Sequence, residues 1–110
     1  GIGQTVVVGG GSVLAVEAID GTDATIERGG RLGVGQAVLV KVCKPNQDFR
    51  FDLPSVGVKT IETMRRAHVR ALAIEAGKTL VFDRAKMVRA ADEADIAIVC
   101  QAETRKAALP

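Results

Sequence analysis

The sequence is poor in aromatic residues, with three Phe and neither Trp nor Tyr among 110 residues. Proteins that bind single-stranded nucleic acids stack bases on aromatic side chains, and nucleic-acid-binding domains in general carry a strong positive charge. The net charge of this chain is +2. We therefore expect no nucleic-acid partner.

Cysteine and histidine are also scarce. Cys43 and Cys100 are too few for a disulfide framework and lack the paired spacing of a zinc site. Both follow apolar, strand-like segments, which predicts buried, reduced thiols in a cytosolic protein. The single histidine, His68, lies among arginines with no acid at helical spacing, so we expect it on the surface.

Long apolar runs are missing, which argues against a transmembrane segment. The chain opens on Gly1 without a signal-peptide pattern, and its first residues already resemble a strand. We therefore expect a domain or fragment of a longer protein. Hydrophobic residues make up 47% of the chain, enough for one modest core.

Hydrophobic periodicity predicts an α/β fold, a single domain with a mixed sheet flanked by a few helices. We expect the domain over residues 1–100 and a polar tail over 101–110. The expected strands cover 4–8, 12–18, 37–42, 48–53, 71–75, 79–82 and 96–100. The expected helices cover 23–28, 60–70 and 84–93, with a mobile Gly-rich loop at 29–35. The expected core positions of the last two helices are Ile61, Met64, Val69, Met87 and Val88.

The densest group of charges is the charged ribbon, residues 41–54 (KVCKPNQDFRFDLP). In a strand, Asp48, Arg50 and Asp52 would share one face, with the two acids about 13 Å apart. They could not bind one Mg²⁺ together, because its oxygen ligands lie about 2.0–2.1 Å away. With Lys41 and Lys44 nearby, the ribbon would suit phosphate handling. The alternative is a solvated edge strand whose charges prevent aggregation.

A second polar group, residues 17–23 (EAIDGTD), stands where a strand meets a helix. A helix N-terminus favours anions, and Glu17, Asp20 and Asp23 could add oxygen ligands for a metal. Turn chemistry and the helix dipole also explain Asp20 and Asp23, with Thr22 as N-cap. They do not explain Glu17. Strict alternation along the strand over 12–18 would place Glu17 with Val13 and Ala15 on an otherwise apolar face.

Three segments resemble successive motifs of the LpxI-type UDP-2,3-diacylglucosamine pyrophosphatases: VEAIDGTDA (16–24), KVCKPNQDFRFDLPSVGVKTIE (41–62) and IEAGKTLVFDRAKMVRAAD (74–92). The similarity runs from IGQTVVV to the last expected strand. Its most specific element is the K-P-x-Q-[DE]-x-R-x-D-x-P run. The resemblance covers the C-terminal one of the family's two domains, so it implies that the N-terminal domain is absent from this chain.

The resemblance implies hydrolysis of UDP-2,3-diacylglucosamine to UMP and 2,3-diacylglucosamine 1-phosphate in lipid A biosynthesis, with Mg²⁺ or another divalent metal. It implies a cytoplasmic enzyme, with peripheral contact to the inner membrane through the acylated substrate. The family's catalytic aspartate corresponds to Asp52. Around it we assign substrate and phosphate binding to Lys41, Lys44, Gln47, Asp48, Arg50 and Thr22, and further metal binding to Glu17 and Asp23.

Two other interpretations stay open. The chain could be a non-catalytic module that binds a nucleotide sugar or lipid, or that dimerises. It could also be a structural fragment that forms a homodimer through an exposed sheet, because loss of a partner domain bares apolar surface.

Overall fold

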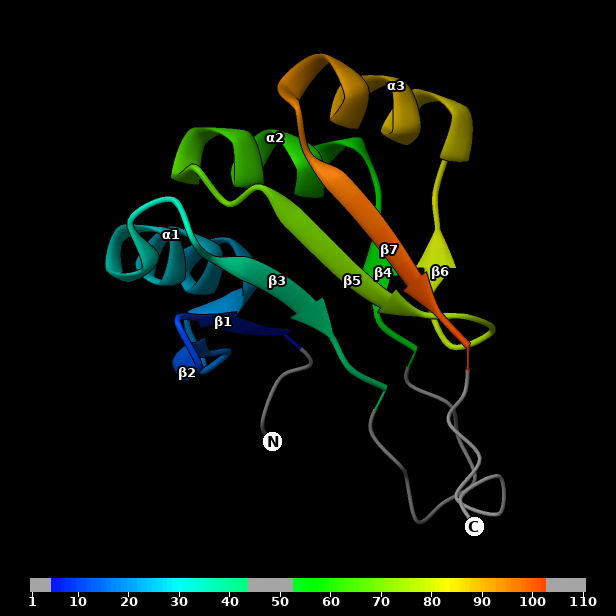
Figure 1. Ribbon diagram of the computed structural model, residues 1–110. Helices are drawn as coiled ribbons and strands as arrows, with labels where there is room; N and C mark the ends of the chain where they lie inside the picture. Colours follow the sequence, from blue (N-terminus) through cyan, green and yellow to red (C-terminus); the bar gives the residue numbers. More distant parts are fainter. Residues whose placement is uncertain (1–4, 44–52, 103–110) are drawn as a thin grey trace, which may run out of the picture.

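The computed structural model describes residues 5–43 and 53–102 of the chain. It confirms the α/β fold: a mixed five-stranded sheet with three helices, as Figure 1 shows. The strand order is β2-β1-β3-β5-β7. These strands are β1 (Thr5–Gly9), β2 (Ser12–Val16), β3 (Val38–Lys41), β5 (Ala71–Glu75) and β7 (Ala97–Gln101).

Strand directions decide which side chains meet at each end of the sheet. β3, β5 and β7 are parallel, and β1 is antiparallel to both β2 and β3. The start of β1 and the end of β2 therefore lie beside the carboxyl end of β3. A small parallel pair, β4 (Ser55–Val56) with β6 (Leu80–Val81), precedes two of the helices.

The helices are α1 (Gly21–Gly33), α2 (Val58–Ala67) and α3 (Arg84–Ala94). They lie in a row on one side of the sheet (Figure 1), with α2 in contact with both α1 and α3. The core lies between the two layers, where Val7, Leu39 and Leu72 alternate with residues that are partly exposed on the other face. None of the described helices covers that second face. No helix in residues 5–43 or 53–102 has the length and apolarity needed to span a membrane.

Helix α1 is much longer than expected, because the predicted mobile loop at residues 29–35 is largely helical. Its glycines allow close packing. A Cβ at Gly29 would collide with the side chain of Val7 in β1, and a Cβ at Gly30 would collide with the backbone oxygen of Ala67 in α2. The loop prediction was wrong because these glycines serve contact between elements rather than chain flexibility.

Three smaller predictions also fail. Val88, expected inside, is 41% exposed on α3, and Cys100, expected buried, is exposed on the edge strand β7. Cys43 is half-buried. The strict alternation expected in β2 is interrupted by a register shift, since Val7 pairs with Ala15 and Val8 with Val13.

Other predictions hold. Ile61, Met64 and Val69 are buried in the core, and Met87 points inward from α3. His68 is exposed and ends α2 in a left-handed conformation. The expected strand over 48–53 lies almost entirely outside the described residues, as does most of the predicted tail.

Candidate functional site

A cluster of polar side chains stands at the carboxyl end of β3. Lys41 is the last residue of that strand and pairs in register with Thr5, the first residue of β1. Both side chains face the helical layer and are buried, Lys41 with 6% and Thr5 with 0% of its surface exposed. A buried ammonium group is costly unless it has hydrogen-bond and charge partners.

The partners form a chain of hydrogen bonds. The Lys41 Nζ donates to Thr5 Oγ1 at 2.9 Å, and Thr5 Oγ1 lies 3.5 Å from Thr22 Oγ1 in the first turn of α1. Thr22 Oγ1 in turn donates to Glu17 Oε1 at 3.2 Å. The ammonium group and the carboxylate are thus joined through two hydroxyl groups.

Asp23 attaches this cluster to α2. Its Oδ1 accepts a hydrogen bond of 3.2 Å from Oγ1 of Thr63, which is buried in the middle of α2. Arg66 approaches the same hydroxyl at 3.5 Å. Strand β3, the loop after β2, and two helices therefore converge on one set of polar groups.

Opposing effects act on the charge of Lys41. Burial lowers the pKa of its ammonium group below the ordinary value of 10.5, because desolvation disfavours the charged form. The negative charges of Glu17 and Asp23 raise it again, with a smaller effect. The two acids therefore act as the charge partners of the buried lysine.

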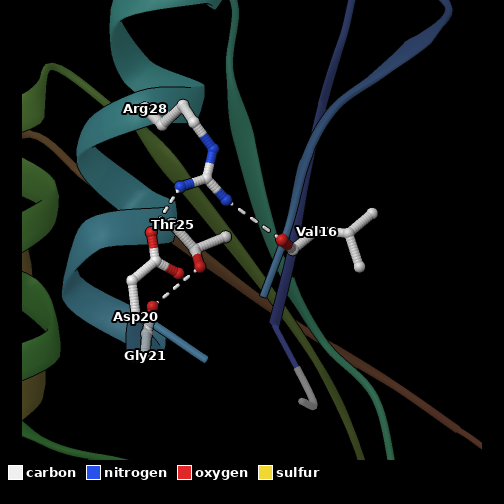
Figure 2. Close-up of polar contacts among 5 residues, drawn as sticks. All are labelled: Val16, Asp20, Gly21, Thr25 and Arg28. Atoms are coloured by element: carbon white, nitrogen blue, oxygen red, sulfur yellow. Dashed lines mark hydrogen bonds and ion pairs between the residues drawn. The ribbon is translucent and has the colours of Figure 1, made fainter. Parts of the chain in front are cut away.

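The loop that carries Glu17 is held in place from both sides (Figure 2). Arg28 in α1 donates to Asp20 Oδ2 at 2.8 Å and to the backbone oxygen of Val16 at 3.0 Å. The backbone N–H of Glu17 donates to the oxygen of Thr5 at 2.9 Å. This arrangement explains Glu17, which lies just past the end of β2 and turns toward Thr22.

The structure brings together four of the residues predicted to form the site: Glu17, Thr22, Asp23 and Lys41. Thr22 lies inside the helix, not at the N-cap, which is Asp20. The other predicted site residues lie outside the described residues: Lys44, Gln47, Asp48, Arg50 and Asp52.

The charged ribbon and the acidic group were treated as separate in the sequence, yet Lys41 belongs to both. The described chain leaves β3 and enters β4 on the side of the sheet where the parallel strands end (Figure 1). Asp52 directly precedes Leu53, where the described chain resumes. The two described ends of the ribbon, residues 41–43 and 53–54, therefore lie on the side of the sheet that carries the polar cluster.

Thr5 and Thr63 are two site residues that the sequence interpretation missed. Thr5 is one of several β-branched residues at the start of a strand and carries no distinguishing signal. Thr63 falls between Ile61 and Met64 on an amphipathic helix. A hydroxyl on that inward side was a usable signal, because a buried hydroxyl needs a partner.

The donor set of this cluster fits a hard divalent cation in part. Carboxylate and hydroxyl oxygens suit Mg²⁺, and Glu17 and Asp23 present the carboxylates. Within residues 5–43 and 53–102, no group of three or more His, Cys, Asp or Glu side chains could hold a metal ion. The further protein ligand that the sequence predicts is Asp52, which lies outside the described residues.

Comparison with known proteins identifies the class. The family model of the LpxI C-terminal domain matches residues 1–99. The chain therefore belongs to the LpxI family. It is 45% identical over 100 residues to the UDP-2,3-diacylglucosamine pyrophosphatase LpxI of Caulobacter vibrioides. That alignment covers 84% of this chain and 36% of the relative, so the chain spans little more than a third of the relative's length.

Proposed function

We propose that this chain is the C-terminal, catalytic part of an enzyme that hydrolyses the pyrophosphate of UDP-2,3-diacylglucosamine. The substrate and the reaction are those that the Caulobacter relative is named for, as a UDP-2,3-diacylglucosamine pyrophosphatase. The proposed products are UMP and 2,3-diacylglucosamine 1-phosphate. The remaining part of the substrate pocket would come from the family's N-terminal domain.

One observation carries the proposal. Lys41 is buried against a bonded set of hydroxyl and carboxylate groups at the carboxyl edge of the sheet, three residues before Lys44 and the rest of the ribbon. Crevices outside the carboxyl ends of strands are the common ligand sites of open α/β sheets. A solvated edge strand would require no such buried cationic network beside it.

The reaction requires charge neutralisation on the phosphates and a positioned water. The water oxygen attacks the phosphorus on the sugar side, the bond from that phosphorus to the bridging oxygen breaks, and UMP leaves with that oxygen. In this proposal Asp52 orients the water or holds the metal, while Arg50 and Lys44 bind phosphate oxygens. Gln47 and Asp48 hydrogen-bond the polar head group.

The residues at the carboxyl edge have a supporting role in this proposal. Lys41 supplies positive charge, and Thr22 keeps Glu17 in position through their hydrogen bond. Asp52 would hold Mg²⁺ together with Asp23 or Glu17. When bound, Mg²⁺ would neutralise the charge that develops on the phosphate oxygens.

The test is Asp52→Asn in the full-length protein, with UMP release as the readout. Loss of one electrostatic group at a reacting centre typically costs about 10²–10³-fold in turnover, and we expect at least that. Circular dichroism checks that the variant folds. Asp95→Asn is the matched control, because Asp95 is an exposed acid at the amino end of β7 and should leave turnover unchanged.

Wild-type turnover in the Asp52→Asn variant would contradict the catalytic role. It would favour the non-catalytic module, in which the ribbon is an edge strand. Magnesium binding, measured by calorimetry on wild type and on Asp52→Asn, separates the metal assignment from the phosphate assignments.

A further inference from the structure

The two edges of the sheet differ in how they are protected. At the β2 edge, Arg28 covers the backbone oxygen of Val16, and Asp20 holds the arginine in place. At the other edge, β7 pairs with β5, and no further described strand lies beside it. Its sequence, AIVCQ, has none of the charges or prolines that usually protect an edge from pairing.

The hydrogen bonds of β7 show which backbone groups are available. The N–H of Ala97 donates to Arg70, and the oxygen of Gln101 accepts from Ala76, so both residues face inward toward β5. Backbone groups alternate sides along a strand. The N–H and C=O groups of Ile98 and Cys100 therefore point away from β5, along an edge that no other described strand covers.

The spacing of the outward-facing residues Ile98 and Cys100 allows two copies of β7 to pair with each other. If two β7 strands run antiparallel about a two-fold axis at Val99, Ile98 of each copy stands opposite Cys100 of the other. In an antiparallel ladder, such outward-facing residues exchange both of their hydrogen bonds. Val99 then meets its own copy at a non-hydrogen-bonded position, where the Cα atoms are about 4.5 Å apart.

Helix α3 supports the same symmetry. It lies at the β7 end of the row of helices (Figure 1). Its exposed charged residues are separated by sign along its length. Arg84, Lys86 and Arg89 occupy its first two turns, and Asp92 and Glu93 its end. A two-fold axis perpendicular to the sheet would place the two α3 helices antiparallel on one face, with each basic end toward the partner's acidic end.

An apolar groove opens at this edge between α3 and β7. It has a volume of about 620 Å³, and Met87, Ala91 and Ile98 are among its lining residues. Val88 lines it too and is 41% exposed. A second copy placed along β7 would cover this surface.

We propose that two copies of this chain associate through β7 and α3 to form one continuous sheet across a two-fold axis at Val99. The partner is a second copy because the strand register and the charges of α3 are both self-complementary, as an isologous interface requires. The inference is independent of the hydrolase reaction.

Charged residues substituted for Val99, at the proposed two-fold axis, test the proposal in the full-length polypeptide. Val99→Lys and Val99→Glu each place two like charges side by side, so each variant alone should dissociate at least tenfold more readily than wild type in sedimentation equilibrium. An equimolar mixture of the two should recover the dimer. Val13→Lys, which changes an exposed valine on the β2 edge, is the control and should leave association unchanged.

Crosslinking tests the register. In a Cys100→Ser background, Val99→Cys should form a disulfide between copies under mild oxidation. Ala97→Cys should not, because two copies of residue 97 would be about 13 Å apart, beyond disulfide reach. A monomeric wild-type protein, dimers that persist in Val99→Lys, a mixture that fails to recover, or equal crosslinking at both positions would each overturn the proposal.

Discussion

The two ends of α1 make different kinds of contact. At its first turn, Thr22 and Asp23 contact polar groups from β1, the loop after β2, and α2. Toward its end, Gly29 and Gly30 have no side chains, and the helix lies against Val7 and Ala67. The first turn of α1 contributes to the polar cluster, and its last turns pack closely against β1 and α2.

This difference indicates what fixes the position of the polar cluster. The hydrogen bonds at the first turn are between 3.2 and 3.5 Å long for Thr22 and Asp23, so a small shift of the helix would break them. Close contact at the glycine end fixes where α1 lies on the sheet. We therefore expect substitutions at the two ends to differ in kind: the glycine end controls stability, and the first turn controls activity.

The largest effect on stability should come from Gly30→Ala. Its Cβ would meet the backbone of Ala67, which cannot move aside as a flexible side chain can. Overpacking of this kind costs about 1–3 kcal/mol, and we expect the upper part of that range in urea unfolding. Gly57→Ala is the control, since a Cβ there would lie 3.5 Å from its nearest neighbour, an ordinary contact. Equal stability of the two variants would remove the packing role from Gly30.

Thr22→Val should lower activity strongly and stability only slightly. It keeps the shape of the side chain but removes the hydroxyl between Thr5 and Glu17, at a cost of about 1 kcal/mol in stability. Thr25→Val is matched to it, because the Thr25 hydroxyl bonds the Gly21 oxygen within the same helix. We expect a tenfold or larger loss of kcat/KM on UDP-2,3-diacylglucosamine for Thr22→Val, and little for Thr25→Val. Similar kinetics for the two variants would mean that the hydroxyl chain is structural.

Lys41→Met should change how stability depends on pH. Because burial lowers the pKa of Lys41 in the folded state, the unfolded chain binds its proton more tightly between that lowered pKa and 10.5. The free energy of unfolding contributed by Lys41 therefore rises as pH rises toward 10.5. We expect wild type to gain stability relative to Lys41→Met over that range in denaturant titrations. A constant difference between the two proteins would contradict the burial effect.

The smallest effect should come from Arg28→Met, which releases the loop carrying Glu17. The Arg28–Asp20 pair is partly exposed, at 33% and 46%, and pairs of this kind contribute about 0.5 kcal/mol. Unfolding by urea measures the change, with Lys86→Met as control, since Lys86 forms a more exposed pair with Asp83. A loss several times larger would show that Arg28 stabilises the loop mainly through the Val16 oxygen.

Periodicity was sufficient to predict the fold class and most elements. β5 was predicted residue for residue, and Ile61, Met64 and Met87 are core residues as expected. Local sequence patterns gave wrong predictions where contacts between distant elements determine the structure. The glycines of α1 were interpreted as a loop because the contacts that require them, Val7 and Ala67, are distant in sequence.

The site shows the same limit. Glu17 was identified as an unexplained acid, Asp23 as a candidate metal ligand and Lys41 as part of the charged ribbon. Their proximity depends on the antiparallel pairing of β1 with β3. Thr5 joins them through that pairing alone, and no sequence signal marks it. The assignments on residues 44–52 stay predictions, with Asp52 the principal one.

The central claim is that the polar cluster at the end of β3 and the ribbon after it form one site. A double-mutant cycle in the full-length protein tests it, with kcat/KM for the proposed reaction measured for Asp52→Glu, Lys41→Met and the combined variant. Residues that act as a unit give non-additive losses. The combined variant should be about as slow as the slower single variant. Losses that simply multiply would contradict the claim.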